Sequence, residues 1–359
     1  MTEKDKQVIS RIEDEISKID NKESNIYFFV TSTHGIFDET IDYIYKMALL
    51  LKESGYNVAL IHQDEKFEPN NWLFNTEYES LPIYDIAKGE VNVGVADILF
   101  IPEVFASVMN QTTKLPCKRI AIIQNITYLT KFMPLSSQIG DFGIVDCLTF
   151  DYSEADLIKS LFPYMHMHIA HTYVDDKFYE TNDLRDMVVN IVSKSENHVN
   201  QIAKQFYWKY PLFKWITFKD MRGLTQEEYL TNLKEANITI WIDDEANNGL
   251  ECLEALANEN IVIAKIPDVI PEWAKNEDGS LNNAAIWVNS IQEIPQIVAN
   301  LVRAVITESI PSEITDDADK VRKQFTKQRS NLEINLAIDD ILSTRKQELN
   351  NIITSIKNK

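Results

Sequence analysis

The chain has 359 residues, 45% of them hydrophobic, and a formal net charge of −20. This length suits two domains better than a single core. So acidic a chain is a poor candidate for a broad nucleic-acid surface, which needs clustered lysine and arginine, or for electrostatic docking to anionic lipid, although a local basic groove is compatible with it.

The cysteines and the lack of long apolar runs indicate a reduced, intracellular location. Cys117, Cys147 and Cys252 are far apart and lack metal-ligand spacing. The charged N-terminus lacks the apolar core of a signal peptide, and no apolar run approaches the ~18 residues of a membrane span. We therefore expect a cytoplasmic protein with no membrane span.

The first part of the chain alternates between apolar strands and helices. Residues 1–23 carry isoleucines at helical spacing and predict a charged amphipathic helix. Residues 38–55 predict a long helix that stops at Gly55, a residue type that favours helix C-termini. The predicted strands are 25–32, 56–62, 96–103, 118–125 and 146–151. We assign a doubly wound α/β domain to residues 24–180.

A second alternation follows the polar stretch 179–187, which we interpret as a linker. Its predicted strands are 188–193, 213–218, 238–242, 261–264 and 285–288. Its predicted helices are 196–210, 225–236 and 291–306, with one more that opens at Gly249. Residues 181–315 thus form a second domain, and residues 316–359, which contain no glycine or proline, form charged terminal helices. The predicted fold class is α/β, with two Rossmann-like, doubly wound domains facing a cleft, where small-molecule sites are common.

The segment 237–264 combines the features of a nucleotide pocket. A buried strand leads into an acidic loop at 243–248, a helix opens at Gly249 and Leu250, and a second strand follows. In a parallel βαβ unit, ligands lie at the carboxyl ends of the strands, where the helix begins. The N–H groups at a helix start suit a phosphate, and a nearby carboxylate suits the hydroxyls of a ribose.

One run of this segment resembles a motif of a known family. Gly249 to Ala257, GLECLEALA, is similar to G-L-x-x-L-E-A-M-A. That motif is typical of nucleotide-sugar glycosyltransferases with the two-domain GT-B fold, of the retaining group 1 (family 4-like) type found in bacteria and phages. Residues 221–228 resemble the loop and helix start that precede the motif, and 96–104 and 118–130 resemble strand ends of related enzymes.

The resemblance, which covers most of residues 25–310, implies roles for particular residues. Glu254 would bind the ribose hydroxyls of the donor, and the helix start at Gly249 and Leu250 would face its diphosphate. Lys194, directly after a predicted strand, would stand where the family places a cation against that diphosphate. Further implied positions are Arg222 near the base or phosphate, and His34 and Gly35 in the first loop, which contacts the acceptor or the donor phosphate.

One position departs from the family pattern. The family has two glutamates eight positions apart; Glu254 matches the second, whereas the first falls at Ala246. Either a loop shift lets Glu245, one residue earlier, contact the donor sugar, or that contact is lost. We predict Glu245 as a catalytic residue together with Lys194 and His34.

Other polar residues are weaker candidates. Glu103, Gln124 and Asn125 end predicted strands and would face the cleft, although buried strands commonly end on polar residues. Three histidines with strand-like spacing invite a metal hypothesis, but no carboxylate or cysteine cluster accompanies them in the sequence, so no metal site is predicted. These histidines are His166, His168 and His171.

The sequence therefore predicts a retaining hexosyltransferase-type enzyme that needs neither a metal nor a cofactor besides its substrate, a nucleotide diphosphate sugar. The second domain would bind this donor, and the first would admit a glycan, protein or modified-base acceptor. One alternative is a catalytically degenerate GT-B-like binding or structural protein, which the loss at Ala246 favours. Another is a phage DNA-modifying glycosyltransferase. The terminal helices would also allow a homo-oligomer.

Overall fold

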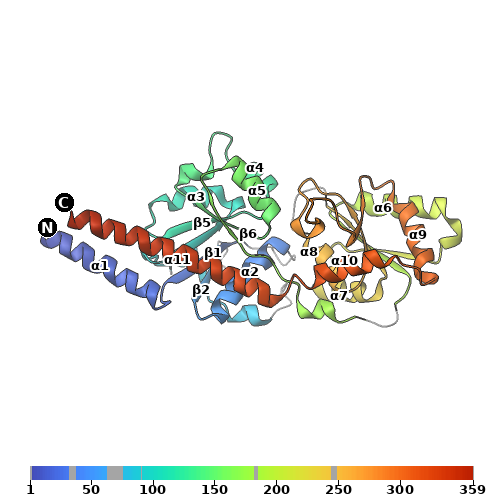
Figure 1. Cartoon of the computed structure of the whole chain (residues 1–359), viewed down its shortest axis with the longest axis horizontal. Helices are drawn as coiled ribbons and strands as arrows, with labels where there is room; N and C mark the ends of the chain where they lie inside the picture. Colours follow the sequence, from blue (N-terminus) through green and yellow to red (C-terminus); the bar gives the residue numbers. More distant parts are fainter. Residues whose placement is uncertain are drawn as a thin grey trace. The chain divides into compact units, whose positions relative to one another are not determined.

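A computed structural model describes residues 2–31, 38–62, 76–89, 91–181, 185–243 and 249–358. Its contacts divide the chain into two compact units. The first comprises Met1–Phe150, Glu154–Thr172 and Ser330–Lys359, and the second comprises Asp151–Ser153 and Tyr173–Arg329. Figure 1 labels the helices of both units and some strands of the first.

Within the described residues, the first unit is built on a seven-stranded parallel sheet in the order β3-β2-β1-β4-β5-β6-β7. Its strands are β1 (Asn25–Val30), β2 (Asn57–His62), β3 (Ile83–Asp85), β4 (Ile98–Pro102), β5 (Lys118–Ile122), β6 (Asp146–Thr149) and β7 (His166–Ile169). A parallel sheet is covered on both faces, so its central strands are apolar throughout, as in β4, where every residue is buried. The strand order reverses between β1 and β4, which makes that gap the topological switch point.

Helices cover this sheet. They are α1 (Glu3–Asp20), α2 (Glu39–Glu53), α3 (Ala106–Gln111), α4 (Ile126–Phe132), α5 (Tyr152–Leu161) and α11 (Lys327–Lys357). Helix α2 begins at the N-cap Asp38, whose carboxylate accepts hydrogen bonds from the N–H groups of Thr40 and Ile41. It is buried from Ile41 to Leu51, so even Lys46 lies inside, paired at 2.9 Å with Asp42.

The long helix α11 comes from the far end of the sequence and packs on the first unit. The Tyr56 hydroxyl donates to the carboxylate of Asp339 at 2.6 Å, and Lys118 pairs with Glu348 at 2.7 Å. Helix α1 lies beside α11 (Figure 1), and Lys357 pairs with Glu13 at 3.7 Å. The two terminal helices therefore contact each other within one chain.

The second unit has a five-stranded parallel sheet in its described residues, in the order β12-β11-β10-β8-β9. Its strands are β8 (Val188–Ser193), β9 (Thr217–Asp220), β10 (Ile238–Ile242), β11 (Ile261–Lys265) and β12 (Ala285–Val288). Its helices are α6 (Glu196–Lys209), α7 (Gln226–Glu235), α8 (Leu250–Ala257), α9 (Ile294–Ile306) and α10 (Ser312–Arg322). The strand order reverses between β8 and β10, the switch point of this sheet.

Alternate residues of each strand enter different cores. Ile240 packs in a cluster with Phe206 of α6 and Val298 of α9. Its neighbour Trp241 packs in another cluster with Leu253 of α8. Because successive strand side chains point to opposite faces, both faces of the sheet are filled. The predicted fold class, α/β with two Rossmann-like domains, is confirmed.

The predicted strand at 213–218 is wrong in its bounds, because β9 covers Thr217–Asp220. A 3-10 helix, Pro211–Phe213, occupies the start of the predicted strand, and the Phe213 ring stacks 6.1 Å from that of Phe206. The other 3-10 helices are Thr76–Ser80, Ile86–Lys88, Glu103–Phe105, Thr112–Lys114, Ile139–Phe142, Asp176–Tyr179 and Glu272–Ala274. Of the helices in the described ranges, none is both long and apolar enough to cross a membrane.

Candidate functional site

The carboxyl edge of the second sheet brings Lys194 next to an acidic residue at the switch point. Ser193 ends β8 and is paired in register with Ile242, which ends β10. The residues that follow, Lys194 and Asp243, are therefore neighbours, with Nζ 3.8 Å from Oδ1. Asp243 is 4% exposed, whereas Lys194 is 58% exposed and reaches toward solvent. An exposed cation thus lies beside a buried carboxylate.

Gly249 begins α8 in a conformation that favours glycine. Its φ is +68°, in the left-handed region. A Cβ built there would lie 3.1 Å from Trp273 and 3.4 Å from Trp241, closer than side chains normally pack. Leu250 is 1% exposed and anchors the helix start in the core. The glycine therefore lets the chain turn tightly into α8 against two indole rings.

Glu254 lies in the second turn of α8, four residues after Leu250 and so on the same helix face. It is 5% exposed. Glu254 is therefore not a solvent-exposed helix glutamate, because α8 is buried along nearly its whole length. A buried carboxylate needs hydrogen-bond donors, which a ribose diol or the protein itself can supply.

Glu251, in the first turn of α8, is a residue that sequence reasoning did not select. One of its carboxylate oxygens, Oε2, is buried and has no hydrogen-bond partner among the described residues. Buried acceptors are nearly always satisfied, so such an atom is a candidate for a ligand hydroxyl. The sequence feature that could have identified Glu251 is its acidic side chain in the first turn of the helix that carries the family motif.

Arg222 lies on the same edge of the sheet, beyond the end of β9. Its guanidinium is held by Asp220, with Nε 3.0 Å from Oδ1, and this contact lowers the pKa of Asp220 below its ordinary value. Because β9 neighbours β8, Arg222 is one strand further from Gly249 than Lys194 is. Lys194 and Arg222 are thus both close to acidic side chains.

The first turn of α6 adds a contact that the sequence did not predict. The Ser193 hydroxyl lies 3.0 Å from Nδ1 of His198 and accepts a hydrogen bond from the N–H of Ser195 at 3.2 Å. These contacts fix the chain on either side of Lys194. No spacing motif signals them, because the pairing depends on the turn between β8 and α6.

The carboxyl edge of the first sheet gathers the predicted strand-end residues. Glu103 is 2% exposed and accepts hydrogen bonds from the N–H groups of Gln124 at 3.1 Å and Asn125 at 3.2 Å. Burial, with a smaller contribution from the nearby carboxylate of Glu154, raises the pKa of Glu103 to about 8 in spite of these bonds. Asn125 caps α4 by accepting from the N–H of Thr127. These side chains hold the strand ends and the start of α4 in place.

The predicted residues His34, Gly35 and Glu245 lie outside the described residues, as does Ala246. In the described residues, Lys194 follows β8 and the helix that Gly249 and Leu250 begin is the next one after β10, the two strands of the second switch point; Glu254 lies on that helix.

The three histidines lie in and just after β7 of the first sheet. His166 and His168 begin that strand, at the amino-terminal edge of the sheet, whereas His171 follows its last residue, Ile169. Nε2 of His168 is 3.4 Å from Asp146, and Nδ1 is 3.5 Å from Asp340. His171 pairs with Glu333 at 2.8 Å. The sequence shows no carboxylate cluster beside these histidines, and the carboxylates that meet them, such as Asp340 and Glu333, come from distant parts of the chain.

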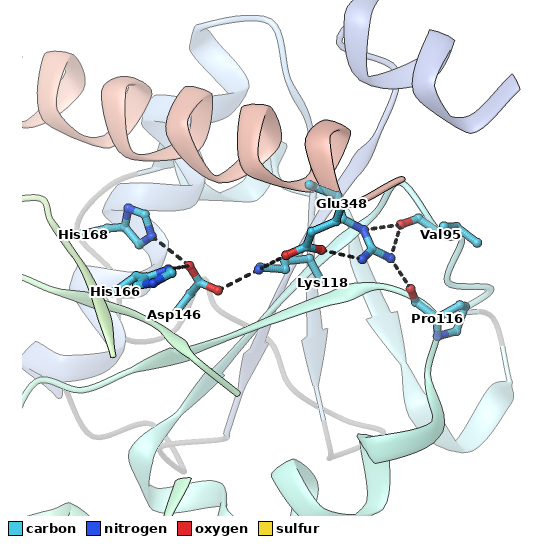
Figure 2. Close-up of polar contacts among 8 residues, drawn as sticks. Val95, Pro116, Lys118, Asp146, His166, His168 and Glu348 are labelled. Carbon is cyan, nitrogen blue, oxygen red and sulfur yellow. Dashed lines mark hydrogen bonds and ion pairs between the residues drawn. The ribbon is translucent and has the colours of Figure 1, made fainter. Parts of the chain in front are cut away.

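Asp146 links His166 and His168 to α11 through Lys118 (Figure 2). Lys118 lies 2.8 Å from Asp146 and 2.7 Å from Glu348. Burial would raise the pKa of Asp146, but its contacts with His168 and Lys118 outweigh burial and lower it. Across the described ranges, no group of three or more histidine, cysteine, aspartate or glutamate side chains could hold a metal ion. The network instead joins the sheet to α11.

No known family model matches the sequence, and no curated protein matches it. Solved structures do. Sucrose-phosphate synthase from Thermosynechococcus elongatus is similar with a TM-score of 0.63 at 9% identity, over 89% of this chain and 100% of that one. TarM of S. aureus has a TM-score of 0.62 at 8% identity, over 89% and 98%.

The pneumococcal O-GlcNAc transferase GtfA, solved with UDP and GlcNAc, has a TM-score of 0.61 at 7% identity, over 89% of this chain and 99% of that one. All three are GT-B glycosyltransferases. Identities this low establish shared architecture alone, and these matches span nearly the full length of each enzyme. The chain therefore has the GT-B fold.

Proposed function

We propose that this protein is a retaining glycosyltransferase that transfers a sugar from a nucleotide diphosphate sugar to an acceptor without a metal ion. The observation that carries the proposal is the placement of Lys194 and the start of α8 at one switch point in a chain with the GT-B fold. Ligands of doubly wound sheets bind at that point.

The second unit would bind the donor. The N-terminal end of α8 offers backbone N–H groups and the positive end of a helix dipole to the diphosphate. The left-handed turn at Gly249, which packs against Trp273 and Trp241, sets where this helix begins. Glu254 would orient the donor through its ribose, and Glu251 offers a second carboxylate close to the helix start.

Lys194 would stabilise the departing diphosphate. As the bond between sugar and phosphate breaks, negative charge grows on the leaving group, and an ammonium aimed at it lowers the barrier. Its partner Asp243 is fixed and buried, whereas the exposed Lys194 side chain can turn from the carboxylate to a bound phosphate. Arg222, after the next strand, would act in the same way. The two side chains would thus supply the positive charge that stabilises the leaving group, in place of a divalent cation.

Nucleotide binding tests the proposal directly. UDP is the first ligand to titrate, because the similar pneumococcal enzyme was solved with it, and GDP is the second. We expect the whole protein to bind one of them by calorimetry, and Lys194→Ala and Glu254→Gln to weaken binding at least about tenfold. Matched controls are the exposed Lys159→Ala and Glu313→Gln, which should bind as the parent does. If neither nucleotide binds, or all four variants bind equally, the assignment is wrong.

A catalytically degenerate GT-B protein is the second candidate. Two observations favour it: Ala246 replaces the expected glutamate, and both Lys194 and Arg222 have acidic neighbours. A panel of nucleotide sugars distinguishes the two functions. Release of nucleotide diphosphate that disappears in Lys194→Ala supports transfer, whereas nucleotide binding with no release from any donor supports degeneracy.

A further inference from the structure

The end of α6 and the turn that follows expose large apolar side chains among lysines. Trp208 is 77% exposed, Leu212 89% and Trp215 55%. The other exposed residues between positions 204 and 215 are Lys204, Lys209, Pro211 and Lys214. The wider stretch 197–219 holds four lysines and no acidic residue in a chain of net charge −20. We call residues 204–215 the Trp-Lys segment.

Beneath this segment lies a packed cluster of aromatic side chains. Phe206 is fully buried, and its ring contacts four aromatic neighbours, Tyr207, Tyr210, Phe213 and Phe218. The Arg303 guanidinium of α9 lies 5.4 Å from the centre of the Phe213 ring, and α9 runs beside α6 (Figure 1). The space under the segment is already filled, so its exposed side chains cannot fold inward. They are therefore available for contact with a binding partner.

The residue types of the Trp-Lys segment favour one kind of binding partner over two others. A second copy of the chain would set lysines against lysines, which is repulsive. A single-stranded nucleic acid would stack its bases on aromatic rings, but the most exposed side chain, Leu212, has no ring. Tryptophan at the headgroup level, an aliphatic side chain in the hydrocarbon and lysines against anionic headgroups are typical of a protein that lies on a bilayer.

We propose that the Trp-Lys segment docks the protein on the surface of an anionic lipid bilayer. Leu212 enters the edge of the hydrocarbon, and Trp208 and Trp215 lie among the headgroups. Lys204, Lys209 and Lys214 meet the anionic lipids. This inference goes beyond the proposed function and does not depend on it.

The net charge of −20 does not oppose this contact at physiological salt. Charges are screened over about 8 Å, so a bilayer is affected mainly by the side chains closest to it. The charged side chains of the segment itself are all lysines. Repulsion from the acidic remainder is strongest at low salt, where screening is weakest, and therefore does not cancel the local attraction under ordinary conditions.

Vesicle sedimentation with the whole protein tests the proposal. One set of vesicles is pure phosphatidylcholine, and in the other phosphatidylglycerol replaces about a third of it. We expect sedimentation with the anionic set and little with the neutral set. The triple variant Lys204→Glu, Lys209→Glu, Lys214→Glu should lower partitioning roughly 100-fold, since each basic side chain contributes about fivefold. The control is Lys4→Glu, Lys6→Glu, Lys357→Glu, which changes the net charge equally and should sediment as the parent does.

A labelled cysteine tests the insertion itself. The native cysteines are all buried, so a thiol-reactive, environment-sensitive dye can be placed at Leu212→Cys alone. Its emission should shift to the blue on adding anionic vesicles, while a dye at Leu336→Cys on α11, also an exposed position, should not shift. Equal binding to both vesicle sets, no shift at position 212, or tight binding of oligothymidylate that the same lysine variant abolishes would overturn the proposal.

Discussion

The Lys194 ammonium lies 3.8 Å from the Asp243 carboxylate because β8 and β10 are neighbours that end level with each other. Removing the negative charge should strengthen the binding of a diphosphate, since Lys194 would no longer be attracted away from it. We expect Asp243→Asn to bind UDP about two- to fivefold more tightly in calorimetry, a modest gain because Lys194 is largely exposed. In the double variant with Lys194→Ala the gain should vanish; a gain that persists would show that Asp243 acts on some other group.

Gly249→Ala should destabilise the second unit. The new methyl group meets two indole rings, and the left-handed φ itself disfavours alanine. We expect a loss of about 2–4 kcal/mol in the free energy of unfolding, measured by denaturant titration.

Gly223→Ala separates these two causes, because Gly223 has a φ of +66° but nothing within 4 Å of its Cβ position. It should cost only about 1 kcal/mol. Equal losses at both glycines would contradict the packing argument.

Glu103 should make the first unit less stable as the pH rises. Burial raises its pKa to about 8 from 4.5, so the folded protein holds a proton that the unfolded chain releases. This contribution is complete below about pH 4.5 and is lost as the pH rises through about 8. Glu103→Gln keeps an oxygen for the N–H groups of Gln124 and Asn125 but cannot ionise.

The variant should therefore gain stability over the parent as the pH increases from about 4.5 to 8. Thermal unfolding of both proteins across that range measures the difference. The exposed Glu79→Gln is the control, and its difference from the parent should stay flat. A difference that is flat for Glu103→Gln as well would mean that its carboxyl group is ionised in the folded state.

Asp146→Asn should weaken the attachment of α11 to the first sheet. The substitution leaves Lys118 and His168, 9% and 6% exposed, without their shared carboxylate (Figure 2). We expect a loss of about 2–3 kcal/mol in chemical denaturation, below the full cost of an unpaired buried charge because Glu348 still contacts Lys118. The exposed Asp156→Asn on α5 should change stability by less than about 0.5 kcal/mol. Similar losses for both variants would show that the network contributes nothing specific.

Much of the fold could be predicted because parallel strands are buried on both faces and so leave local apolar runs. The strand at Ile238–Ile242 is all apolar or β-branched and was found with its bounds intact. The short edge strand Ile83–Asp85 was missed, since three residues carry too little pattern. The start of β9 was misplaced because aromatic residues that suit a strand are used in the cluster around Phe206.

The features of the candidate site also divide into those that the sequence could predict and those that it could not. Lys194 and Gly249 could be placed on the carboxyl edge because strand ends and helix starts are local features. The contacts that these residues make could not be predicted. The approach of Lys194 to Asp243, for example, depends on which strands pair. The contact between His171 and Glu333, 162 positions apart, depends on where α11 packs.

Helix α11 belongs to the first unit but is synthesised after the second. On the ribosome, the segment from Tyr173 to Arg329 is complete before α11 emerges, so the middle of the nascent chain can reach its native state earlier than the beginning. Until then the surface around Tyr56 and Lys118 lacks the carboxylates of Asp339 and Glu348. Truncation of the last helix would therefore damage the half of the protein that is made first.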